Sequence, residues 1–171
     1  HPQDKLVPRA RYARGMARQQ LGKFEPAIDD VQALLGADPT PAERSDARYV
    51  LGLCLAGMKK HGDAAAAFRK LLEDDPQYAA KDKVLYELAW ALHSAGQAKE
   101  AAAAFAQLAK EHPDSPLAAE AFFHQGEHAY EAGDFAAAAG AYYNAAKKAG
   151  GAPLGEKATY KLGWAYFRQD E

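Results

Sequence analysis

The chain has 171 residues, a formal net charge of −2 and a hydrophobic content of 49%, values that are typical of a globular protein of one or two domains. The near-neutral charge argues against a nucleic-acid backbone as the main partner. Cys54 is the single cysteine, so no internal disulfide can form. No apolar run reaches the roughly 18 residues of a membrane helix, so we expect no membrane insertion.

Several kinds of residue recur along the chain at a constant interval of 37 residues. One set is uniformly small: Gly15, Gly52, Ala89, Gly126 and Gly163. A second set is aromatic: Tyr12, Tyr49, Tyr86, Phe123 and Tyr160. Three further sets, of alanine, of large apolar residues and of proline, share the same interval. Independent sets with one period indicate an internal structural repeat.

Each repeat reads as two helices joined by a short turn. In the third repeat, Leu85, Leu88 and Leu92 recur at helical spacing, and Phe105 lies on the apolar face of the second helix. Three repeats carry a glycine where a helix commonly ends: Gly22, Gly96 and Gly133. Lys59 holds this place in the second repeat, so we expect a neighbouring glycine, Gly57 or Gly62, to form that turn.

Two later helices begin with capping signals. Thr40 and Glu43 have the spacing of a capping box, with Pro41 at the first helical position. Ser115 followed by Pro116 repeats the cap and the proline. These signals predict that the links between repeats end at residues 40 and 115.

The interval divides residues 1–171 into a single array of units. The expected units are 8–44, 45–81, 82–118 and 119–155, followed by a partial unit at 156–171. Residues 1–7 align with the link that follows a unit, so we expect a fragment of a longer array. This arrangement predicts about nine helices, namely four αα-hairpins and one helix without its partner. A single hairpin cannot bury both of its faces, so neighbouring hairpins must stack.

A fixed order runs through the repeats: a small residue, alanine, an aromatic residue and proline. In the second repeat these are Gly52, Ala64, Phe68 and Pro76. The order resembles the tetratricopeptide repeat, an αα-hairpin module of about 34 residues. The resemblance covers the chain from end to end and implies an all-α, right-handed superhelical solenoid.

The interval of 37 residues is longer than that module, and the extra length falls in the links between units. In this respect the chain is similar to the repeats of bacterial cell-envelope proteins, such as the Tol-Pal-associated periplasmic protein and the lipoprotein of the outer-membrane β-barrel assembly machine. On this narrower resemblance we expect a location in the periplasm or cell envelope rather than in the cytoplasm.

Tetratricopeptide arrays bind ligands in a concave groove lined by the first helix of each unit. The resemblance implies that the following residues face this groove: Tyr49, Lys83, Tyr86, Trp90, His93, Phe123, Glu127, Tyr130, Tyr160, Trp164 and Phe167. Aromatic residues are frequent hot spots of binding. For the aromatic set that recurs every 37 residues, packing between units is the favoured interpretation. For Trp90, Trp164 and Phe167, both binding and packing remain open.

The resemblance implies a non-enzymatic scaffold that binds a peptide or protein segment. The alternative is a structural spacer within a longer multi-repeat bacterial protein.

The carboxylate clamp of chaperone-binding members needs lysine and asparagine where this chain has Tyr12 and Met16, so no such clamp is expected. No Gly-rich phosphate loop, Ser-His-Asp order or CxxC pair is present, and we expect neither catalysis nor a cofactor. The oligomeric state is open.

His124, Glu127 and His128 form an H-x-x-E-H motif, the spacing of an inverted zinc-protease motif. Two imidazoles four residues apart on a helix share a face and could bind one metal ion, with Glu127 as the general base. In the repeat register these are ordinary positions of a first helix, and Glu131 is the nearest further ligand. We therefore interpret them as helix-surface residues and expect no functional zinc.

Arg11, Arg14 and Arg18 are spaced to share one face of the first helix. Arg14 and Arg18 take positions that hold leucine in the second and third units. Long side chains whose stems pack while their charged ends reach water explain this pattern. The alternative is a site for an anion or an acidic partner.

Cys54 aligns with alanine in three other units, so we interpret it as a small core residue.

Overall fold

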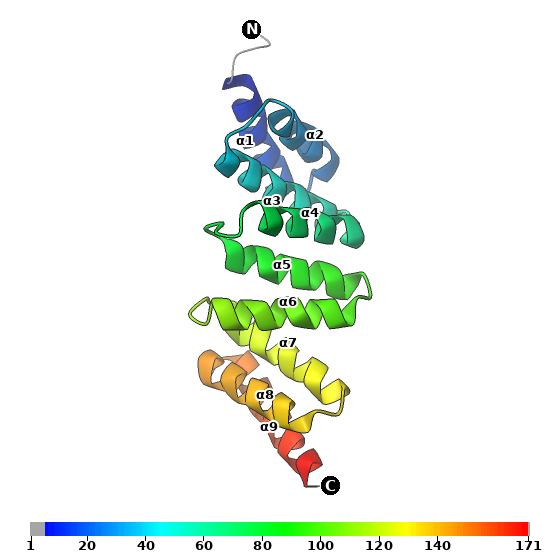
Figure 1. Cartoon of the computed structure of the whole chain (residues 1–171), viewed down its shortest axis with the longest axis vertical. Helices are drawn as coiled ribbons and strands as arrows, with labels where there is room; N and C mark the ends of the chain where they lie inside the picture. Colours follow the sequence, from blue (N-terminus) through cyan, green and yellow to red (C-terminus); the bar gives the residue numbers. More distant parts are fainter. Residues whose placement is uncertain (1–5, 171) are drawn as a thin grey trace. The chain divides into compact units, whose positions relative to one another are not determined.

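The computed structural model describes residues 6–170. This part of the chain contains nine α-helices and no β-strand (Figure 1). The helices belong to two compact units, unit 1 (His1–Ala95) and unit 2 (Gly96–Glu171). The predicted all-α fold of repeated αα-hairpins is therefore confirmed.

Unit 1 contains five helices: α1 (Leu6–Gln20), α2 (Phe24–Leu35), α3 (Pro41–Gly57), α4 (His61–Asp74) and α5 (Lys81–Ser94). Unit 2 contains four: α6 (Ala98–Glu111), α7 (Ala118–Glu131), α8 (Phe135–Ala149) and α9 (Pro153–Gln169). The odd-numbered helices are the first helices of the repeats, and the even-numbered helices are the second helices.

The first helices start one to four residues before the predicted unit boundaries. Leu6 and Val7 already belong to α1, although we expected them in a link. The rest of that predicted link, residues 1–5, lies outside the described residues. Pro41 and Pro153 occupy the first position of α3 and α9, where the fixed φ of proline favours helix initiation.

The predicted capping box of α3 is present. The Glu43 amide donates a hydrogen bond to Thr40 Oγ1, and the Thr40 amide donates to Glu43 Oε2 at 2.9 Å. The second predicted cap was wrong: α7 begins at Ala118, and its N-cap residue is Leu117. Ser115 instead accepts a hydrogen bond from the Leu117 amide at 3.2 Å. Its hydroxyl is therefore used in the link, one turn before the helix begins.

The turns after α1, α5 and α7 each contain a glycine with positive φ, as expected: Gly22 (71°), Gly96 (78°) and Gly133 (79°). In the turn after α3, our expectation of Gly57 or Gly62 was wrong, because Lys59 itself adopts φ 61°. The Lys60 amide donates to the Leu55 carbonyl at 2.9 Å, just as the Asp134 amide donates to the Ala129 carbonyl at 2.9 Å. The turns after α3 and α7 therefore share this hydrogen bond. Lys59 adopts a backbone conformation that is unfavourable for a residue with a side chain.

Replacing Lys59 with glycine should raise the free energy of unfolding by roughly 1 kcal/mol, because glycine adopts positive φ without the steric penalty of a Cβ atom. Lys59 is exposed, so the substitution removes no core contact. The measurement is the urea midpoint of the variant, with Lys60→Gly as the control, because Lys60 has φ −84°. A variant that is less stable than the wild type would contradict the assignment of this turn.

Within a hairpin, a small residue of the first helix faces a large residue of the second. A Cβ atom added to Gly52 would lie 2.7 Å from Cζ of Phe68, and one added to Gly126 would lie 2.7 Å from Cδ1 of Tyr142. Such distances are too short for van der Waals contact. The glycines therefore allow the rings to lie against the backbone of the facing helix, as the sequence pattern predicted.

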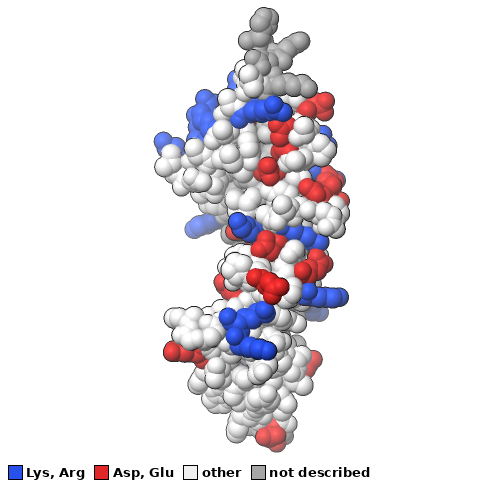
Figure 2. Space-filling model, turned by 90° about the vertical axis from the view of Figure 1, so that its left-hand side faces the viewer, with Lys and Arg blue, Asp and Glu red and all other residues white. Residues whose placement is uncertain are grey.

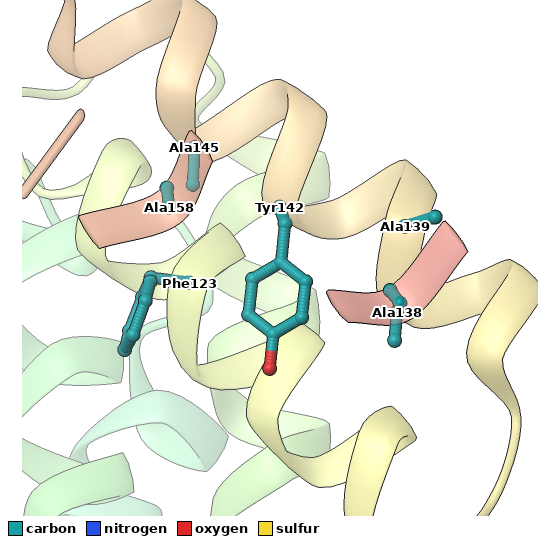
Figure 3. Packing of buried hydrophobic residues seen from close by; sticks show 7 residues of the cluster. Phe123, Ala138, Ala139, Tyr142, Ala145 and Ala158 are labelled. Carbon is teal, nitrogen blue, oxygen red and sulfur yellow. The ribbon is translucent and has the colours of Figure 1, made fainter. Parts of the chain in front are cut away.

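Each unit has its own apolar core. In unit 1 the buried cluster includes Val31, Leu34 and Val50, and Cys54 lies in it with no exposed surface. In unit 2, Tyr142 points from α8 towards α7, and Phe123 and several small alanines surround it (Figure 3). The alanines keep the helices close together, and the aromatic rings fill the remaining space.

Candidate functional site

Three rings follow one another along α5 and form the α5 ring triad, defined as Tyr86, Trp90 and His93. The centroids of Tyr86 and Trp90 are 6.3 Å apart with an interplanar angle of 72°, and those of Trp90 and His93 are 5.6 Å apart at 86°. Tyr86 and Trp90 are half-buried, and His93 is exposed. Edge-to-face contacts of this kind hold neighbouring rings in a fixed orientation.

The same arrangement recurs on α9 as the α9 ring triad, defined as Tyr160, Trp164 and Phe167. Tyr160 and Trp164 are 6.3 Å apart at 72°, and Trp164 and Phe167 are 5.8 Å apart at 88°. The three rings are 65%, 43% and 55% exposed. With Thr159 and Gly163 they line an open, largely apolar depression of about 450 Å³. The two triads therefore match closely in geometry at equivalent repeat positions.

The equivalent positions of α7 are built differently. Phe123 is only 2% exposed and packs against Tyr142 at 5.7 Å, so it belongs to the core and offers no surface to a ligand. Glu127 accepts a hydrogen bond from the Tyr142 hydroxyl and lies 2.9 Å from Lys161 Nζ. Tyr130 is half-buried and packs edge-on against Phe135 at 5.2 Å. Of the α7 residues predicted to face the groove, Phe123 lies in the core, Glu127 forms an ion pair and Tyr130 remains half-buried.

In unit 1 the surface continues from α5 to α3. Tyr49 lies half-buried, 6.1 Å from the ring of Phe68 and 6.3 Å from that of Tyr78. The Tyr78 hydroxyl donates a hydrogen bond to Asp46 Oδ1 at 2.8 Å. Lys83 is exposed at the start of α5. Sequence reasoning missed Asp46 and Tyr78, because Tyr78 lies in a link with no helical periodicity that could indicate a contact with α3.

Phenol groups in this region are shielded from water. Burial, and then the charge of Asp46, raises the pKa of Tyr12 to about 12. Burial, and then the charges of Glu87 and Asp82, raises the pKa of Tyr49 to about 12. Both phenols therefore remain neutral hydrogen-bonding groups at physiological pH.

The residues of the H-x-x-E-H motif have other neighbours. His124 stacks on Phe105 with centroids 4.8 Å apart, and its Nε2 lies 3.8 Å from Glu120. Burial raises the pKa of Glu127, but the hydrogen bonds from Tyr142 and Lys161 outweigh this effect and lower it overall. In residues 6–170, no group of three or more His, Cys, Asp or Glu side chains has the arrangement of a metal site. The motif thus contributes packing and an ion pair to unit 2.

Arg14 and Arg18 meet a buried carboxylate of their own hairpin. Arg14 donates to Asp30 through Nε at 2.9 Å and through Nη2 at 2.6 Å, and Arg18 Nη1 donates to Asp30 at 2.7 Å. The Asp30 side chain is 4% exposed. The hydrogen bond from Arg14 lowers the pKa of Asp30 despite its burial. The anion that binds Arg14 and Arg18 is therefore Asp30 of the same hairpin. Arg11 is exposed on α1.

Cys54 is fully buried in unit 1, which confirms its predicted place in the core. Burial raises the pKa of its thiol to about 11. The thiolate is the nucleophilic form of cysteine, and at neutral pH this side chain is almost entirely protonated. Cys54 therefore serves packing.

Charged side chains of both signs lie on the surface. Figure 2 shows acidic and basic groups interspersed over unit 1 and a broad uncharged area on unit 2. Within residues 6–170, the helices are too short or too polar to cross a lipid bilayer.

These features define an αα-hairpin repeat protein with aromatic surfaces on its first helices. The model of the family described as tetratricopeptide repeat matches residues 12–79 and 86–153. The chain belongs to the tetratricopeptide repeat family.

Solved structures with a similar fold cover nearly the whole chain. A kinesin light chain protein of Podosopora anserina with nearly identical TPR-like repeats matches with a TM-score of 0.69 and 14% identity, covering 99% of this chain and 89% of that one. BtubC (BKLC) from P. vanneervenii matches with a TM-score of 0.69 and 14% identity, covering 91% of this chain and 70% of that one. At this identity the likeness shows the fold alone. A search of curated proteins finds no match. The narrower resemblance to cell-envelope proteins gains no support and stays a prediction.

Proposed function

We propose that this protein is a non-enzymatic scaffold that binds a peptide or protein segment through the aromatic surfaces of its first helices. The observation that carries the proposal is the recurrence of one ring arrangement on α5 and α9, with matching centroid distances and angles. Apolar rings that remain exposed are typical of interaction surfaces. On α9 all three rings of the triad are more than 40% exposed.

The chemistry of the triads fits a protein ligand. Tryptophan and tyrosine offer a large contact area and lose little conformational entropy on binding, which is why they dominate binding energies at interfaces. Figure 2 shows acidic and basic groups interspersed over unit 1. A surface of mixed charge complements a peptide or protein better than it complements a uniformly charged phosphate backbone.

The test is a peptide array probed with the wild-type chain and with the Trp90→Ala and Trp164→Ala variants. We expect each substitution to weaken binding by roughly tenfold or more, because buried tryptophan anchors contribute most of the energy of such interfaces. The matched control is Tyr143→Ala, because Tyr143 is 53% exposed but lies on the second helix α8. Circular dichroism checks that each variant is folded.

Three outcomes separate the candidates. Binding that is lost in the tryptophan variants and kept in Tyr143→Ala supports the scaffold. Binding that survives both tryptophan substitutions refutes the triads as its site. No binding to any peptide favours the alternative, a structural spacer, which needs no ligand.

We also propose a periplasmic or cell-envelope location, which rests on the 37-residue interval alone. Fractionation of the source cells, with an antibody to this chain, tests it. Recovery in the cytoplasmic fraction would refute it.

A further inference from the structure

We propose that unit 1 recognises a lysine or arginine side chain of its partner. The site is the unit 1 face, defined as Asp46 and Tyr49 on α3, Tyr78 in the link between α4 and α5, and Glu87 and Trp90 on α5. The inference rests on the proposed function, because it names the chemistry of the segment that the first helices would bind.

Two carboxylates of the unit 1 face have no basic partner. Asp46 accepts a hydrogen bond from Tyr78. Glu87 is half-buried. In residues 6–170, neither group forms an ion pair with a lysine or arginine. Asp46 is exposed, whereas Glu87 is partly desolvated. A partly desolvated carboxylate without a counter-ion gains more from an incoming cation than one that water already solvates fully.

The electrostatic environment of Glu87 agrees with this picture. Burial raises the pKa of its carboxyl group, and no neighbouring cation offsets that effect. The negative charge of Glu87 also reaches Tyr49, whose pKa it raises in addition to burial. Tyr49 and Glu87 lie on α3 and α5, two helices of unit 1 that contact each other.

The rings of the same face complete the recognition of a basic side chain. Tyr49 and Tyr78 lie 6.3 Å apart with tilted planes, and Trp90 lies three residues, about one helical turn, beyond Glu87. Aromatic faces attract a cation through their quadrupole, and they also pack against the aliphatic stem of lysine or arginine.

Unit 2 already contains a complete arrangement of this kind. There Lys161 of α9 lies 2.9 Å from the Glu127 carboxylate and 5.9 Å from the centre of the Tyr130 ring. Lys157 lies 4.5 Å from the centre of the Phe123 ring. Lys161 also occupies the repeat position of Glu87, so this position is basic on α9 and acidic on α5. The chain thus supplies the cation itself in unit 2, whereas Asp46 and Glu87 of unit 1 form no ion pair with a lysine or arginine of residues 6–170.

The experiment uses the whole 171-residue chain and sets of short peptides that differ only in one position, which holds Lys, Arg, Gln or Glu. Binding is followed by fluorescence anisotropy of labelled peptides. We expect the best Lys and Arg peptides to bind at least about fivefold more tightly than their Gln counterparts, and the Glu peptides most weakly. Raising the salt concentration should reduce this preference.

Two conservative variants locate the preference. Glu87→Gln and Asp46→Asn should each reduce the ratio of Lys to Gln affinity towards one. The control is Glu25→Gln, which removes an exposed acidic charge from the second helix α2 and should leave the ratio unchanged. Thermal melts confirm that the variants fold.

The outcomes separate this inference from the proposed function. Peptides that bind in a Trp90-dependent way without any preference for Lys or Arg overturn the inference and leave the scaffold intact. A preference that persists in both carboxylate variants overturns the assignment to this face. The absence of binding by every peptide overturns both proposals.

Discussion

Replacing Gly52 with alanine should destabilise the wild-type chain but stabilise a chain that already carries Phe68→Ala. In the wild type, the new methyl group would lie 2.7 Å from Cζ and 2.8 Å from Cδ1 of Phe68, which is fully buried and cannot easily move. Overpacking of this kind costs roughly 1–3 kcal/mol. Once the ring is removed, the clash disappears and only the higher helix propensity of alanine remains, which contributes up to about 1 kcal/mol.

Phe68→Ala alone should lower the free energy of unfolding by roughly 3–5 kcal/mol, because it leaves a cavity between α3 and α4. The measurement is a double-mutant cycle in guanidinium chloride. The control is Gly140→Ala, in the middle of α8, where an added Cβ meets nothing within 4 Å. Gly140→Ala should stabilise the chain in both backgrounds. An equal effect of Gly52→Ala with and without Phe68 would contradict the pairing of Gly52 with Phe68 in the α3–α4 hairpin.

The second large effect concerns the ion pairs of Asp30. We expect the double variant Arg14→Leu with Arg18→Leu to be less stable than the wild type by roughly 2–4 kcal/mol, because a buried carboxylate is left without partners. Adding Asp30→Ala should restore stability to the wild-type level or above. The triple variant reproduces the residues of the second unit, Leu51, Leu55 and Ala67, at the same repeat positions.

The pH dependence provides an independent measurement. Because the folded-state pKa of Asp30 is lowered, its contribution to stability is present above the unfolded pKa of about 3.9. It is lost as the pH falls through the lower pKa of the folded state. The triple variant should therefore lose less stability than the wild type on acidification below about pH 4. A triple variant that is as unstable as the double variant would show that Asp30 does not account for the effect.

The repeated hairpins could be predicted from the sequence because they follow from short-range patterns. Glycine or alanine sixteen residues before a large apolar residue places the two side chains opposite each other in an αα-hairpin, as Gly126 and Tyr142 show. The capping box of Thr40 and Glu43 is local in the same sense. Patterns of this kind depend on helical periodicity, which is the strongest signal that a single sequence contains.

Other features depend on contacts that periodicity does not encode. Lys59 adopts a positive φ because α3 and α4 must be joined by the same turn as the other hairpins, which overrides its local preference. Arg14, Arg18 and Asp30 stand where the second repeat has two leucines and an alanine. All three positions differ together, so no single position predicted the ion pairs of Asp30.

The candidate site was predicted only in outline. Phe123 belongs to the same recurring set as Tyr160, yet Phe123 is 2% exposed and Tyr160 is 65% exposed. The difference arises because Tyr142 and Lys157 cover Phe123. Burial depends on what neighbouring helices contribute at each repeat, so equal positions in the sequence do not ensure equal environments.

We propose that a partner segment lies on the first helices. Photo-crosslinking tests it most directly, with a photoreactive amino acid placed either at Lys83 on the first helix α5 or at Tyr143 on the second helix α8, both of which are exposed. With a peptide that binds the wild-type chain, we expect covalent capture from position 83 and none from position 143. Capture from position 143 alone would contradict it.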